Sequence, residues 1–199
     1  IGTCLVAKFN ENGEFNLVLS DDFSISAKEG NLKGKRFSSK VDRKVFPQWL
    51  KEHASEVKCV IHIGARTDTT EFNKSIFDEL NVNYSKELWN ICAEHQIPLI
   101  YASSAATYGL GEHGYTDDET KIPLLKPLNP YNPKYTNGGQ LRDFVYVKDV
   151  VNVIWFLYSH KVKSGIYNLG SGKARTFLDL ATATFNAIGK PVNIEFIDT

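Results

Sequence analysis

Two short apolar runs constrain the fold of this chain more than any other feature. Residues 57–63 and 99–102 are apolar over most of their length, and Gly64 follows one run while Ser103 follows the other. Strands with nearly continuous apolar sequence are typical of parallel sheets that helices cover on both faces. Because helical patterns alternate with these runs, we predict an α/β fold with a doubly wound parallel sheet.

The hydrophobic periodicity predicts the other elements of this fold. Helices are expected at residues 1–9, 46–53, 77–92, 148–158 and 177–188, and strands at 15–19, 141–147, 165–170 and 192–197. Residues 24–44 are polar and basic, which predicts a solvated loop. Four prolines between positions 123 and 133 exclude a regular helix there.

Composition narrows the classes of function. The 199 residues carry 23 basic and 23 acidic side chains, so no basic excess points to nucleic acid or to an anionic membrane. No apolar run reaches membrane-spanning length, and no signal peptide is visible. Cys4, Cys59 and Cys92 lie far apart without C-x-x-C spacing, which predicts reduced structural thiols, no metal site and a cytoplasmic location.

Polar residues at the ends of predicted strands are the candidate site. Ligands of open parallel sheets bind beyond the carboxyl ends of the strands, where Ser104 and Asp21 fall. An acidic residue such as Asp21 holds ribose hydroxyls in dinucleotide folds, although a turn or a helix cap explains either residue equally simply. His62 lies within an apolar strand and is interpreted as a hydrogen-bonded core residue. The Asn81 amide needs partners on the buried side of its helix, which a neighbouring strand end or a ligand could supply.

Several motifs occur in the order of one known family. They are the strand ending near Asp21, residues 62–65 (H-I-G-A), 81–82 (N-V), 101–109 (Y-A-S-S-A-A-T-Y-G), 142–149 (R-D-F-V-Y-V-K-D) and 168–172 (N-L-G-S-G). Together they resemble the extended short-chain dehydrogenase/reductase family of nucleotide-sugar enzymes. The resemblance implies a Rossmann-type sheet, a small C-terminal substrate lobe and a tightly held nicotinamide cofactor. It also implies transient oxidation of a sugar and return of the hydride to its opposite face.

Shorter phrases are most similar to the branch that epimerises ADP-linked heptoses for lipopolysaccharide core synthesis. That similarity implies an ADP-sugar substrate, a homo-oligomer and NADP, although Asp21 by itself favours NAD because a carboxylate repels a 2′-phosphate. The implied catalytic residues are Ser104, Tyr131 and Lys134. The implied cofactor-binding residues are Ile1, Asp21, Asp22, Lys28, Arg43, Ile63, Gly64, Ala65, Arg66 and Asn81. A UDP-hexose 4-epimerase, a dTDP-sugar dehydratase and a non-catalytic nucleotide-binding remnant are the alternatives.

The sequence departs from the family pattern at one place. The family has Tyr-x-x-x-Lys, whereas this chain has Tyr131-x-x-Lys134 with Pro133 between them, and residues 135–140 resemble a region much further along the family chain. We therefore expect an internal segment to be missing near Lys134, so that the substrate lobe is incomplete, and the first strand to be missing before Ile1. Residues 1–134 are assigned to the NADP-binding domain and 135–199 to the remainder of the sheet and the substrate lobe.

Overall fold

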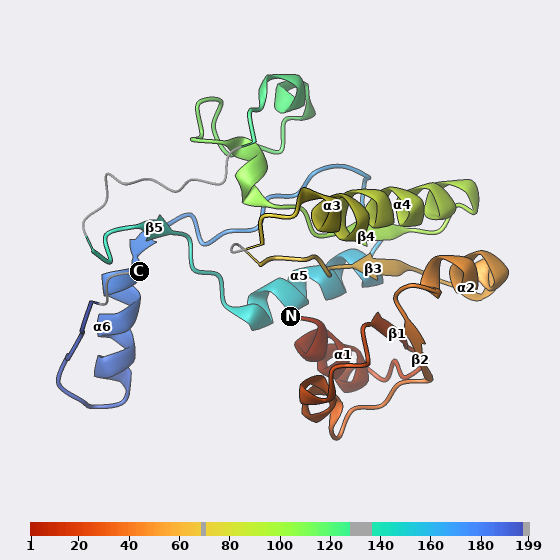
Figure 1. Ribbon diagram of the computed structural model, residues 1–199, viewed down its shortest axis with the longest axis horizontal. Helices are drawn as coiled ribbons and strands as arrows, with labels where there is room; N and C mark the ends of the chain where they lie inside the picture. Colours follow the sequence, from red (N-terminus) through yellow and green to blue (C-terminus); the bar gives the residue numbers. More distant parts are fainter. Residues whose placement is uncertain (69–70, 128–136, 197–199) are drawn as a thin grey trace. The chain divides into compact units, whose positions relative to one another are not determined.

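The computed structural model describes residues 1–68, 71–127 and 137–196 (Figure 1). The chain divides into two compact units. Unit 1 comprises Ile1–Ser103 and Val147–Val162, and unit 2 comprises Ser104–Tyr146 and Lys163–Thr199. The domain boundary predicted at residue 134 lies outside the described residues.

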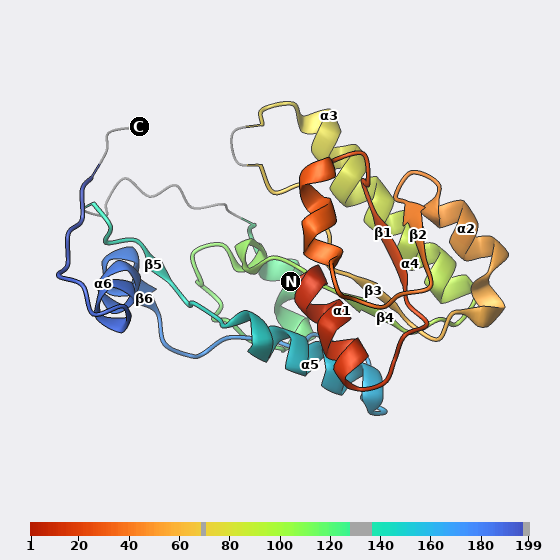
Figure 2. The ribbon, with the colours of Figure 1, turned by 90° about the horizontal axis from the view of Figure 1, so that it is seen from below.

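Unit 1 alternates helices with two pairs of parallel strands. In chain order it contains α1 (Gly2–Glu11), β1 (Val18–Asp21), the 3-10 helix η1 (Ser26–Leu32), β2 (Ser39–Asp42), α2 (Phe46–Glu52), the 3-10 helix η2 (Ala54–Glu56), β3 (Val60–His62), α3 (Lys74–Phe77), the π-helix η3 (Asp78–Asn83), α4 (Tyr84–Glu94), β4 (Leu99–Tyr101) and α5 (Val147–Ser159). Strand β1 pairs with β2 and β3 pairs with β4, both in parallel (Figure 2). The predicted α/β class and the parallel pairing are confirmed.

Two apolar clusters hold these elements in place. One cluster joins α2 and α4 to β3 and consists of Phe46, Leu50, Val60, Leu88, Ile91, Cys92 and Ile97. The other joins α1 to α5 through Leu5, Phe9, Val151 and Ile154, and Figure 2 shows these two helices side by side. Burial of each large aliphatic side chain stabilises the fold by roughly 1.5–3 kcal/mol. The ends of β1 and β3 are therefore carried by a packed scaffold.

Unit 2 contains fewer regular elements. They are the 3-10 helices η4 (Ala105–Tyr108) and η5 (Glu119–Leu124), the antiparallel strands β5 (Leu141–Arg142) and β6 (Arg175–Thr176), and α6 (Phe177–Ala187). Helix α6 begins with a capping box, in which the Thr176 hydroxyl accepts from the Asp179 N–H and the Asp179 carboxylate accepts from the Thr176 N–H. These two bonds satisfy N–H groups that a helix start otherwise leaves free.

Several strand predictions were wrong. Residues 165–170 and 192–196 form no strand, and the strand predicted at 141–147 ends at Arg142 because α5 begins at Val147. Alternating apolar residues favour a strand only where a neighbouring strand accepts the backbone hydrogen bonds. The solvated loop predicted at 24–44 contains η1 and β2, because polar β2 pairs with β1 while most of its side chains remain exposed. Among the described residues, no helix is long and apolar enough to cross a membrane.

Candidate functional site

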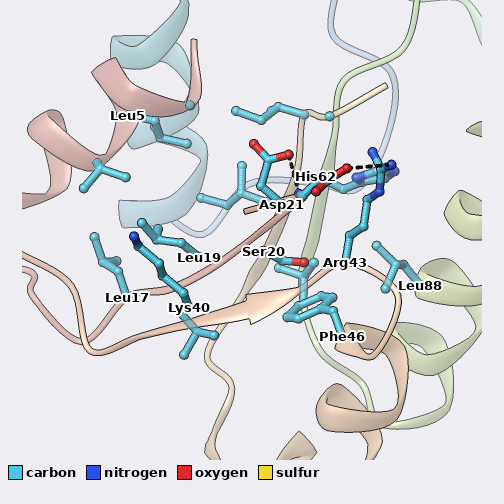
Figure 3. A pocket seen from close by; sticks show the side chains of 18 of the residues that line it. Leu5, Leu17, Leu19, Ser20, Asp21, Lys40, Arg43, Phe46, His62 and Leu88 are labelled. Carbon is cyan, nitrogen blue, oxygen red and sulfur yellow. Dashed lines mark hydrogen bonds and ion pairs between the residues drawn. The ribbon is translucent and has the colours of Figure 1, made fainter. Parts of the chain in front are cut away.

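A cavity of about 1620 Å³ lies in unit 1 and runs along β1 and β3, from residues that precede these strands to residues beyond their carboxyl ends. Residues that follow these strands line it, together with Ile1 and Gly2 at the start of α1. Figure 3 shows Asp21, Arg43 and His62 near one another, with Leu5, Leu17 and Leu19 on the left and Leu88 beside Arg43. A site at strand ends, beside the start of a helix, is where open α/β sheets bind ligands.

Two carboxylates and two cations face one another at the end of the β1–β2 pair. Lys28 Nζ lies 2.8 Å from Asp21 Oδ1, and an Arg43 guanidinium nitrogen lies 3.4 Å from Asp22 Oδ2. Hydrogen bonds from the Ser24 hydroxyl and backbone N–H lower the pKa of Asp22, and the charges of Arg43 and Lys28 lower it further. The site therefore holds ionised carboxylates for hydroxyl donors and cations for an anion.

Arg43 carries an unsatisfied hydrogen-bond donor. Its Nε is buried and has no hydrogen-bond partner, the one such side-chain atom found in the described ranges. Buried polar groups in proteins almost always have partners, so this N–H fits an acceptor that a ligand brings. A phosphate-bearing group placed between Arg43 and Lys28 meets that requirement.

The loop after β3 forms another wall of the cavity. Ile63, Gly64, Ala65 and Arg66 all line it, as the sequence predicted for residues beside a cofactor. Asn81 is not among the lining residues. Instead its Nδ2 donates to the Arg66 carbonyl at 2.9 Å, and its Oδ1 accepts from the Arg66 N–H at 2.7 Å. Asn81 thus bonds the loop after β3, four residues beyond the end of that strand.

His62 is the hydrogen-bonded core residue that the sequence predicted. It is 8% exposed, its Nε2 lies 2.8 Å from Ser85 Oγ, and its ring contacts those of Tyr84 and Tyr101. Burial lowers the pKa of His62. The neutral imidazole is therefore favoured in the folded protein.

Sequence reasoning missed Tyr84, which was placed in an apolar helical stripe. The Tyr84 side chain lines the cavity, and burial raises its pKa against the opposing effect of a hydrogen bond from Ser20. A tyrosine on the buried side of a helix carries a hydroxyl that needs a partner, and this was the available signal.

Ser104 opens unit 2 and caps η4. Its Oγ accepts from the Ala106 N–H at 3.2 Å, and its carbonyl oxygen accepts from the Thr107 hydroxyl at 2.8 Å. Tyr131 and Lys134 lie outside the described residues. The structure thus gathers nine of the predicted residues around the unit 1 cavity: Ile1, Asp21, Asp22, Lys28, Arg43, Ile63, Gly64, Ala65 and Arg66.

The described residues contain no cluster of His, Cys, Asp and Glu that suits a metal ion, and Cys4, Cys59 and Cys92 are free thiols. Parallel strands joined through helices, with a cavity at their carboxyl ends, define the Rossmann-type class of α/β protein.

The chain belongs to the NAD dependent epimerase/dehydratase family, whose profile matches residues 1–134 and 132–170. It is 35% identical over 262 positions to the ADP-L-glycero-D-manno-heptose-6-epimerase of Fusobacterium nucleatum, covering 98% of this chain and 79% of the relative. It is 34% identical to the enzyme of the same name from Nitratidesulfovibrio vulgaris, covering 100% of this chain and 81% of the relative.

Solved structures share the fold. The Helicobacter pylori ADP-L-glycero-D-manno-heptose-6-epimerase superposes with a TM-score of 0.71 at 22% identity, covering 95% of this chain and 79% of the other. The UDP-glucuronic acid 4-epimerase of Bacillus cereus, in complex with NAD, gives 0.75 at 17% identity and covers 99% of this chain and 83% of the other. The Rossmann-type architecture predicted from the sequence is confirmed.

The matches also locate a gap inside the chain. The Fusobacterium alignment spans 262 positions against the 199 residues of this chain, so at least 63 positions have no residue here. The family profile matches in two pieces that meet at residues 132–134. This is the place where the Tyr-x-x-x-Lys pattern is interrupted, so the sequence of this chain lacks an internal segment that its relatives carry.

Proposed function

We propose that this protein is a cytoplasmic, NADP-dependent epimerase that interconverts ADP-D-glycero-D-manno-heptose and ADP-L-glycero-D-manno-heptose for lipopolysaccharide core synthesis. The observation that carries the proposal is the match to two heptose epimerases over 98% and 100% of the chain. The geometry that supports it is the cavity with paired charges at the ends of β1 and β2.

The residues of the cavity fit a nicotinamide dinucleotide. Asp21 and Asp22 offer acceptors for ribose hydroxyls, and the buried Arg43 Nε and the Lys28 ammonium offer donors for a phosphate. We assign the cofactor as NADP because both cations stand beside the carboxylates, and we keep NAD as the alternative. When bound, the nicotinamide supplies a reversible acceptor for the hydride of the sugar.

Three residues are assigned to the sugar. The Ser104 hydroxyl orients the reacting oxygen, and Tyr131 takes up and returns the hydroxyl proton. Lys134 is assigned to lower the pKa of Tyr131, since a neighbouring ammonium favours the phenolate. These three roles follow from the resemblance to the family, and the interrupted spacing makes Lys134 the weakest of them.

A second candidate is a nucleotide-binding protein without turnover. The specific observation that favours it is the internal gap at residues 132–134, where the family pattern of tyrosine and lysine is interrupted. In that case the unit 1 cavity still binds the dinucleotide, but no sugar is converted.

The remaining alternatives are a UDP-hexose 4-epimerase and a dTDP-sugar dehydratase. Each retains the fold and the hydride chemistry but acts on another sugar.

One experiment separates these functions. The purified chain is incubated with NADP and, in parallel reactions, with ADP-D-glycero-D-manno-heptose, UDP-glucose and dTDP-glucose, and the products are followed by proton NMR. The proposal predicts inversion at one carbon of the heptose and no change in the hexoses. Conversion of a hexose points to the other family members, and dinucleotide binding without any product points to the remnant.

Sequencing the gene on both sides of Lys134 shows whether the protein itself lacks the internal segment.

A further inference from the structure

The loop of residues 63–68 packs against the apolar cluster of α1 and α5 through Ile63. It follows β3 without belonging to a helix or strand, and all six of its residues line the cavity. Residues 64–67 are exposed, and a Cβ added at Gly64 would meet no atom within 4 Å. Side-chain packing therefore constrains the backbone of residues 64–67 only weakly.

Asn81 holds this loop through hydrogen bonds from the neighbouring helix. Its amide makes two hydrogen bonds to the backbone of one residue, accepting from the Arg66 N–H at 2.7 Å and donating to the Arg66 carbonyl at 2.9 Å. The Arg66 guanidinium in turn donates to Asp68 at 2.9 Å within the same loop. Both backbone groups of Arg66 are thus held by one side chain, as a neighbouring strand would hold them.

The helix that carries Asn81 is irregular at this point. Asn81 belongs to the π-helix η3, which lies between α3 and α4. Short π segments are uncommon and occur frequently at functional sites, because they alter the direction of side chains relative to a regular helix. In η3 and the first residue of α4, Glu79, Leu80, Asn83 and Tyr84 line the cavity while Asn81 binds the loop.

We propose that Asn81 is a positioning residue, which holds the loop of residues 63–68 in the conformation that receives the dinucleotide. Asn81 acts through the Arg66 backbone and does not touch the ligand itself. The inference rests on the proposed function, since it requires a dinucleotide in the unit 1 cavity. The core residues of α4, Leu88, Ile91 and Cys92, belong to a separate packed cluster, so the fold does not depend on the clamp.

Two variants and one control test this. Asn81→Ala removes both hydrogen bonds, whereas Asn81→Asp retains the acceptor for the Arg66 N–H and loses the donor. Asn12→Ala is the control, because Asn12 also donates to a backbone carbonyl, that of Lys8 at 2.7 Å, but does not line the cavity. The measurements are amide hydrogen exchange of the loop, the dissociation constant for NADPH from its fluorescence, and the melting temperature.

We expect Asn81→Ala to accelerate exchange at Arg66 and to raise the NADPH dissociation constant about tenfold, consistent with loss of two hydrogen bonds that order a binding loop. Asn81→Asp should keep the Arg66 N–H protected and bind NADPH with intermediate affinity. All three variants should melt within a few degrees of the unaltered protein. Unchanged NADPH affinity in Asn81→Ala, with faster loop exchange, overturns the inference while leaving the proposed function intact. Failure of the unaltered protein to bind either NADPH or NADH overturns both.

Discussion

The guanidinium of Arg43 lies 3.4 Å from the carboxylate of Asp22, joining the residues that follow two paired parallel strands. The Arg43 N–H also donates to the Asp21 carbonyl at 3.1 Å. A hydrogen bond therefore holds the Arg43 backbone and an ion pair orients its side chain, while its buried Nε has no hydrogen-bond partner. Under the proposed function, Arg43 is therefore the residue that we expect to distinguish NADP from NAD.

Replacement of Arg43 should change cofactor preference. Arg43→Ala is expected to weaken NADP binding by about 10- to 100-fold, the usual effect of losing hydrogen bonds to a charged group, and to weaken NAD binding much less. Calorimetric titration with both dinucleotides measures the difference. Lys51→Ala is the matched control, since Lys51 forms a 3.5 Å ion pair with Glu87 and does not line the cavity. Equal losses for NADP and NAD in Arg43→Ala contradict the assignment.

Replacement of Ser104 tests whether its hydroxyl acts in catalysis or only caps η4. Ser104→Ala removes the hydroxyl that caps η4, which costs about 1 kcal/mol of stability, and should reduce turnover by roughly 100-fold or more with cofactor binding intact. Turnover of the heptose and NADP affinity are measured on the same preparation. Ser159→Ala, which removes a hydroxyl bonded to the Trp155 carbonyl, is the control and should retain full turnover. If Ser104→Ala keeps its turnover, Ser104 is a cap alone and the sugar lies elsewhere.

The lowered pKa of His62 predicts how the free energy of unfolding depends on pH. Burial lowers its pKa in the folded protein below the ordinary value of 6.5, so the unfolded chain binds the proton more readily. The free energy of unfolding should therefore decrease as the pH falls below about 6.5 and continue to decrease until the folded-state pKa is passed. Urea unfolding between pH 5 and 8 measures this trend.

The variant His62→Gln should flatten the trend, because its side chain does not titrate. The variant His95→Gln, at the exposed residue that follows α4, controls for the substitution of a histidine by glutamine. A slope that persists in His62→Gln assigns the acid sensitivity to other groups.

The capping box of α6 gives a prediction for unit 2. Thr176→Ala removes the acceptor for the Asp179 N–H at 2.9 Å and should lower the free energy of unfolding by about 1 kcal/mol. Thr184→Ala, within the same helix, removes a hydroxyl that donates to the Leu180 carbonyl and should cost less than about 0.5 kcal/mol. Denaturant unfolding of the two variants tests the comparison, and equal losses contradict a special role for the cap.

The sequence predicts the part of the fold that local patterns encode. The sequence shows the apolar faces of α1, α2 and α4 and the apolar runs of β3 and β4, because helical and strand periodicities differ. Strand β2 was missed because Ser39 and Lys40 are polar, and such an edge is defined by its partner β1 and not by its own side chains. The strands predicted at 165–170 and 192–197 failed for the converse reason, since the apolar alternation of the described residues there has no paired neighbour.

The sequence predicts the parts of the site in which a residue follows a strand, as Asp21 and Gly64 do. It does not predict the contacts that the side chains of the site make with other segments. Lys28, which pairs with Asp21, lies within the 3-10 helix η1, and Asn81, which binds Arg66, lies within a π-helix that the hydrophobic periodicity does not reveal. Tyr84 was predicted to belong to an apolar stripe, whereas the structure places it among the residues that line the cavity.

Titration of the purified chain with NADP, followed by calorimetry at low and moderate salt, tests the central claim most directly. The account predicts saturable binding at one site per chain, tighter for NADP than for NAD and weakened by salt because Lys28 and Arg43 bind the phosphate. The absence of binding to either dinucleotide would contradict the account.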